Sequence, residues 1–124
     1  MTDQNTLDAF QTMWGMFPEP VLLVQKDRTI LAVNRLAAQL GVQAGIRCFT
    51  LNPAHDPQSV CQRCRANQAL QSQQAVCEST PDGIRGYWIP VENQSDLYIH
   101  FGIGTAEAFA QAQATPSQEL VSLQ

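Results

Sequence analysis

The sequence predicts an α+β fold, with one five-stranded antiparallel sheet and helices packed on one face of it. Three observations support this prediction. Apolar runs of strand length come first as a pair and later as a group of three: 21–25, 29–33, 75–79, 84–91 and 97–103. Stretches with helical spacing or strong helix formers lie before, between and after these runs. Short polar turns such as Pro81-Asp82-Gly83 separate neighbouring runs, as expected for antiparallel partners.

The first element is expected to be a helix over residues 6–16. Its apolar residues recur every three or four positions and form one face: Leu7, Phe10, Met13, Trp14 and Phe17. Thr6 is the expected N-cap, and Pro18-Glu19-Pro20 ends the helix because proline removes a backbone donor. This face is expected to cap the sheet, to form a dimer surface, or to do both, since Trp and Met are enriched at interfaces.

A hairpin follows, with the polar turn Lys26-Asp27-Arg28 between its two strands. Asn34 comes directly after the second strand, and its side chain is expected to cap a short helix over residues 35–40 that ends at Gly41. Residues 45–57 are expected to be irregular, with prolines at two positions. A second amphipathic helix is predicted over residues 61–74.

The three later runs read as strands of a meander. Pro90 within the run 84–91 indicates an edge or a bulge, and residues 92–96 form the expected turn. A helix is predicted from Thr105 to Ala114, followed by a polar tail. The expected organisation is therefore an N-terminal cap helix at 1–17, the main domain at 18–104, and a C-terminal helix and tail at 105–124.

Composition limits the classes of function. A chain of 124 residues with 44% hydrophobic residues can form one domain with a real core. The net charge is −4 and only seven Lys and Arg are scattered along the chain, which argues against nucleic-acid binding. No apolar run is long enough to span a bilayer, and the N-terminus lacks a secretory signal. We therefore expect a cytoplasmic protein without membrane or nucleic-acid partners.

No catalytic constellation is visible, so the chain is expected not to be an enzyme. The serines Ser59, Ser79 and Ser95 have no base and acid at workable positions, and no glycine-rich segment opens a phosphate-binding loop. His100 lies in the last strand and is expected to be a packed or surface side chain rather than a catalyst.

The four cysteines are the main candidate site: Cys48, Cys61, Cys64 and Cys77. Two residues lie between Cys61 and Cys64, and twelve residues separate this pair from the cysteine on either side. In a reducing compartment such a set favours a metal site over disulfides, and four thiolates suit Zn²⁺ or an iron–sulfur cluster. His55 could replace one thiolate. Two alternatives stay open: a redox-active Cys61–Cys64 pair, and unconnected core cysteines, with Cys77 in an alternating strand.

Residues 21–40, with Asn34, Ala37, Ala38 and Gly41, resemble the PAS domain family, as does Tyr87 to Val91 with its proline near the end. The spacing of Gly45, Cys48, His55, Cys61 and Cys64 is similar to a pattern in PAS domains of bacterial sensor proteins. The chain departs from the family in two places: the turn 26–28 lacks the usual glycine, and residues 102–106 replace the family's Asp-Ile-Thr ending.

The resemblance implies a PAS-like sheet and a sensory, signalling or protein-interaction module. Because the ending that passes signals onward is absent, it also implies action through a signalling protein partner, and pairing as a homodimer through the N-terminal helix. A pocket for a small ligand between sheet and helices would be lined by Trp88, Tyr87 and Phe101. Haem would need an axial ligand, and no histidine lies on the expected helix. The alternatives are a thiol–disulfide redox protein using Cys61 and Cys64, and a structural partner protein that binds no metal.

Overall fold

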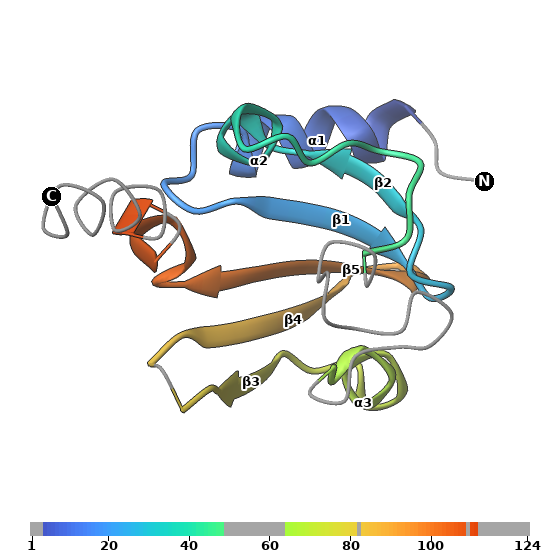
Figure 1. Ribbon diagram of the computed structural model, residues 1–124. Helices are drawn as coiled ribbons and strands as arrows, with labels where there is room; N and C mark the ends of the chain where they lie inside the picture. The colour runs from blue at the N-terminus through green and yellow to red at the C-terminus, as the bar shows by residue number, and fades with distance from the viewer. Residues whose placement is uncertain (1–3, 49–63, 82, 109, 112–124) are drawn as a thin grey trace, which may run out of the picture.

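The computed structural model describes residues 4–48, 64–81, 83–108 and 110–111. Figure 1 shows the arrangement of its helices and strands. In chain order they are α1 (Gln4–Trp14), β1 (Val21–Gln25), β2 (Ile30–Val33), α2 (Arg35–Gln39), α3 (Ala66–Ser72), β3 (Val76–Ser79), β4 (Arg85–Val91) and β5 (Gln94–Ile103). Residues 105–108 and 110–111 are also helical.

The five strands form one sheet in the order β2-β1-β5-β4-β3, and every neighbouring pair is antiparallel. The hairpin β1–β2 therefore joins the meander β3–β4–β5 through pairing of β1 with the last strand, which lies at the centre of the sheet (Figure 1). This confirms the predicted α+β fold with a five-stranded antiparallel sheet. Hairpin followed by meander is also the order on which the resemblance to PAS domains rests.

The core is divided between the two faces of the sheet. On one face, α2 and α3 cover residues that alternate along the strands, including Leu22, Trp88 and Tyr98. On the other face, α1 lays Phe10 against Leu23 and Phe101, with Leu7, Trp14 and Phe17 packed around them. The expectation of helices on one face therefore holds for α2 and α3, whereas α1 covers the opposite face. The α1 residues that face the sheet act as the cap that the sequence suggested.

Most strand boundaries agree with the prediction to within one residue, whereas the starts of β5, α1 and α3 differ by more. The strand β5 starts at Gln94, because Glu92 and Asn93 alone form the turn, with Asn93 at a φ of 66°. The helix α1 begins at Gln4, so Thr6 is inside it and is not the N-cap. The helix α3 begins at Ala66 and not at residue 61, so Cys64 precedes the helix. Its buried face is formed by Ala66, Ala69 and Leu70.

Two turns show how local sequence produces these elements. The Asn34 side chain caps α2 by accepting a hydrogen bond from the Ala37 N–H at 3.0 Å, as predicted. Gly41 follows the helix at a φ of 92°, which only glycine adopts readily. In the hairpin turn Arg28 takes a φ of 78°, so it occupies the left-handed position where a glycine is usual. Within the part of the chain described, no helix is long and apolar enough to cross a membrane.

Candidate functional site

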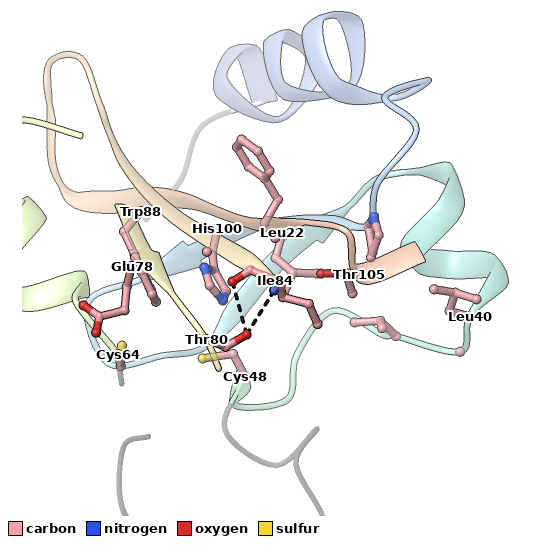
Figure 2. A pocket seen from close by; sticks show the side chains of 16 residues that line it. Leu22, Leu40, Cys48, Cys64, Glu78, Thr80, Ile84, Trp88, His100 and Thr105 are labelled. Atoms are coloured by element: carbon pink, nitrogen blue, oxygen red, sulfur yellow. Dashed lines mark hydrogen bonds between the residues drawn. The ribbon is translucent and has the colours of Figure 1, made fainter. Parts of the chain in front are cut away.

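A cavity of about 560 Å³ lies on the face of the sheet that α2 and α3 share. The central strands of the sheet form its floor. Its sides come from the segment that follows α2 and from Cys64, just before α3 (Figure 2). The described residues that line it are Pro20, Leu22, Leu40, Gly41, Val42, Cys48, Cys64, Glu78, Thr80, Ile84, Gly86, Trp88, His100, Phe101, Gly102 and Thr105. This wall is mainly apolar, with a few polar groups, as is usual for sites that hold small molecules.

Backbone pairing holds one side of the cavity in place. Ile30 donates its N–H to the Ile46 carbonyl at 2.8 Å, and Gly45 donates to the Ile30 carbonyl at 2.8 Å. The Cys48 N–H in turn donates to the Arg28 carbonyl at 2.8 Å. These bonds hold the segment after α2 against the β1–β2 turn and the start of β2, and so place Cys48 in the cavity wall.

Glycine shapes the other end of the cavity. A Cβ at Gly102 would lie 2.5 Å from the Thr105 hydroxyl oxygen and 3.1 Å from a methyl carbon of Ile84. Glycine therefore lets Thr105 and Ile84 approach β5 closely, in line with the expectation that Gly102 allows close packing. Thr105 and Ile84 both line the cavity at this end (Figure 2).

His100 stands at the centre of the floor. Its Nδ1 lies 2.9 Å from the Tyr87 carbonyl oxygen, so Nδ1 carries the proton and donates it to this bond. The ring is stacked on Trp88, with centroids 4.8 Å apart and planes 18° apart. Burial lowers the pKa of His100, which favours the neutral ring. The sequence singled out this residue as a packed or surface side chain; it is packed on Trp88, and it also lines the cavity, which the sequence did not indicate.

Two further polar residues of the wall are held by bonds within the protein. The Glu78 carboxylate pairs with the Arg65 guanidinium at 2.9 Å, between groups that are both partly exposed. The Thr80 hydroxyl accepts from the Ile84 N–H at 3.1 Å and contacts the Ile84 carbonyl at 3.2 Å, as the dashed lines in Figure 2 show. Glu78 therefore places no unpaired charge in the cavity, and the neutral Thr80 hydroxyl is already hydrogen-bonded.

Beneath one side of the cavity, the buried residues Arg28 and Tyr98 lie beside the half-buried Cys48 and Cys64. Arg28 is 4% exposed; its guanidinium donates to the Lys26 carbonyl and to the Asn67 side-chain oxygen, and lies 5.9 Å from the centre of the Tyr98 ring. Burial raises the pKa of Tyr98 well above its usual range, and the nearby Cys48 and Cys64 thiols raise it further. Both cysteines pack against the core cluster that contains Tyr98.

Cys77 does not join this cluster. On β3, Val76 packs against the core on the α3 side and Glu78 lines the cavity, so the residue between them points to the other face. Its partner in the ladder is Tyr87, which packs on the α1 side. The Cys77 side chain is also exposed. Strand alternation therefore places Cys77 on the opposite face of the sheet from Cys48 and Cys64, and the four-cysteine site remains a prediction because Cys61 lies outside the described residues.

The remaining candidate ligands, Cys61 and His55, lie outside the described residues. Within the ranges that the structure describes, no three His, Cys, Asp or Glu side chains come together as they would to hold a metal ion. Of the predicted metal ligands, Cys48 and Cys64 alone are thus brought to one place in the described part of the chain.

The aromatic residues expected around a ligand are divided between the two faces. Trp88 lines the cavity as predicted. Tyr87 does not line it: its ring stacks on Phe101 on the α1 side, with centroids 5.1 Å apart. Phe101 contributes to the cavity wall, but its ring also contacts Trp14 and Phe17 below α1. Period-two alternation on β4 is the signal that separates Tyr87 from Trp88.

Comparison with known proteins adds a structural likeness. No model of a known protein family matches the chain, and no curated protein is similar enough to be matched. Among solved structures, the chain is similar to the PAS domain of an HTR-like protein from Haloarcula marismortui, with 16% sequence identity and a TM-score of 0.48. The match covers 80% of this chain and 91% of that domain. The sheet itself, rather than this likeness, establishes the fold class.

Proposed function

We propose that this chain is a non-enzymatic, PAS-like sensory or protein-interaction module that holds a small molecule between its sheet and its helices. The observation that carries the proposal is the cavity of about 560 Å³, whose size and mainly apolar wall suit a compact organic ligand. The polar wall residues Glu78 and Thr80 are engaged within the protein, which favours a binding role over a catalytic one for this cavity.

Binding of the neutral fluorophore N-phenyl-1-naphthylamine tests this function. We expect saturable binding of one molecule per chain, and at least tenfold weaker binding in Ile84→Trp, because the larger ring fills the cavity. Ile103→Trp is the matched control: Ile103 is 43% exposed and lies outside the cavity wall. Equal binding by Ile84→Trp and the wild type would place the probe elsewhere and contradict the proposal.

A second candidate function is metal binding by the thiols on the cavity wall, which would make the module a metal-dependent or redox sensor. It is favoured by the position of Cys48 and Cys64 in one cavity beside a buried guanidinium. A site built from several thiolates carries net negative charge, and Arg28 would offset it. Cys61, which two residues separate from Cys64 in Cys-x-x-Cys spacing, is the natural third ligand. Zinc would be structural, whereas an iron–sulfur cluster would be redox-active.

Anaerobic purification with metal analysis and a visible spectrum tests the metal site. We expect Cys64→Ser to lose the metal and Cys77→Ser to keep it, because Cys77 is on the opposite face of the sheet. Colourless protein with one zinc ion indicates a structural site, and broad visible absorption with iron and sulfide indicates a cluster. A wild-type chain without metal rules out this second function. Loss of metal in both variants would mean that Cys77 is also a ligand, as in the predicted four-cysteine site.

A further inference from the structure

The floor of the cavity presents one ring nitrogen, Nε2 of His100, that no residue in the described part of the chain engages. The two nitrogens of His100 differ, because Nδ1 is bound to the Tyr87 carbonyl oxygen at 2.9 Å. In the neutral ring the proton is then on Nδ1, and Nε2 carries a lone pair. No hydrogen bond joins Nε2 to any of the residues that the structure describes. His100 therefore offers a hydrogen-bond acceptor, and no donor, to whatever occupies the cavity.

This nitrogen is held in a defined orientation. The Tyr87 carbonyl lies on β4, next to β5, and Trp88 stacks on the ring at a centroid distance of 4.8 Å. A hydrogen bond and a stacked neighbour together restrict both side-chain torsions of the histidine. Burial lowers the pKa of the ring, so it remains neutral at neutral pH and Nε2 stays an acceptor.

The rest of the wall sets the other demands on the occupant. Glu78 and Thr80 are bonded to Arg65 and Ile84, so no strong charge faces the cavity uncompensated. Most of the wall beside His100 is apolar, including Leu22, Val42 and Trp88. An ionised ligand would lose its hydration here without gaining an opposite charge, whereas an uncharged, mostly apolar ligand would not.

Resting on the proposed ligand-binding function, we propose that the occupant is an uncharged, largely apolar molecule that donates one hydrogen bond, from a hydroxyl or an N–H group, to Nε2 of His100. His100 is then the residue that determines specificity. A molecule of the same shape without the donor covers Nε2, leaves this acceptor unpaired and therefore binds more weakly.

The experiment compares two probes that differ in this donor, 2-naphthol and 2-methoxynaphthalene, by titration of the full chain and fluorescence detection. We expect the wild type to bind 2-naphthol about tenfold more tightly, the usual effect of one hydrogen bond in a buried site. In His100→Phe, which keeps a ring against Trp88 but has no acceptor, we expect the two affinities to become equal. The imidazole ¹⁵N shift of His100 in the wild type should move with 2-naphthol alone, which tests the bond without any substitution.

The outcomes separate the role of His100 from the ligand-binding function on which it rests. Equal binding of both probes by the wild type, or a preference that persists in His100→Phe, overturns the role of His100 and leaves the ligand-binding function standing. Binding of neither probe, and of no N-phenyl-1-naphthylamine, overturns the ligand-binding function itself. If His100→Phe does not fold, the affinity ratio and the ¹⁵N shift of the wild type still decide.

Discussion

At the scale of single residues, Asn34 connects more of the structure than any local motif indicates. Its side-chain oxygen accepts from Val21 and Ala37, both at 3.0 Å, and its amide group donates toward three carbonyls of the segment before β1. Those carbonyls belong to Trp14, Phe17 and Glu19. The residue is 1% exposed, so water cannot replace these bonds. The sequence predicted only the cap on α2, because the other partners lie 13 to 20 residues earlier in the chain.

Replacement of Asn34 by alanine should therefore cost much more than the loss of a helix cap. We expect Asn34→Ala to lower the free energy of unfolding by about 2–4 kcal/mol, because several buried backbone groups lose their partners at once. Urea denaturation measures this. Asn5→Ala, at an exposed position in α1, is the control and should change stability by less than about 0.5 kcal/mol. An equal, small effect of both substitutions would show that the network contributes little.

At the scale of elements, the segment between α1 and β1 is joined to the end of β5. The Glu19 carboxylate accepts hydrogen bonds from the backbone N–H groups of Gly104 and Ala106, both at 2.8 Å. One side chain thus fixes the start of the helical segment that follows β5 to the entry of β1. No local pattern predicts this bond, because its ends are 85 and 87 residues apart.

Loss of the Glu19 carboxylate should loosen the segment after β5 while the sheet stays intact. In Glu19→Ala we expect amide hydrogen exchange at Gly104 and Ala106 to accelerate at least tenfold, since one charge-assisted bond per group is lost. Exchange in the β1–β5 pairing should stay slow. Glu92→Ala, in the turn between β4 and β5, is the control. Unchanged exchange at Gly104 and Ala106 would mean that the segment is held by other contacts.

At the scale of the whole molecule, the two faces of the sheet have different roles. The face below α2 and α3 contains the cavity and the thiols, and the face below α1 contains an aromatic cluster around Phe101. The outer surface at the end of α1 remains apolar, with Met13 in the helix and Met16 two residues after it, each 75% exposed. We propose that a homodimer forms through this outer surface, since the inner residues of α1 are already used against the sheet.

A charge on the outer surface of α1 should therefore weaken the dimer without unfolding the domain. We expect Met13→Asp to raise the dimer dissociation constant at least tenfold, because it would bury an unpaired carboxylate. Sedimentation equilibrium measures this, and Ile103→Asp, on another exposed apolar residue, is the matched control. A wild-type chain that stays monomeric at high concentration, or a Met13→Asp dimer of unchanged affinity, would contradict the proposal.

The sequence by itself determined the class of fold, the approximate positions of the strands, and the cap and turn at the two ends of α2. Apolar runs, the cap at Asn34 and the turn at Gly41 depend on residues close in the chain, and the structure confirms them. The alternation of side chains along a strand also implies that the neighbours Cys77 and Glu78 point to opposite faces of the sheet.

Only the tertiary structure decided which elements cover each face. Packing at long range sets α1 on one side of the sheet and α2 with α3 on the other. The same packing separates Cys77 from Cys48 and Cys64, and places His100 in the floor of a cavity. A strand's own pattern gives the period of its side chains, but burial against distant partners selects the face, and the candidate site depends on that choice.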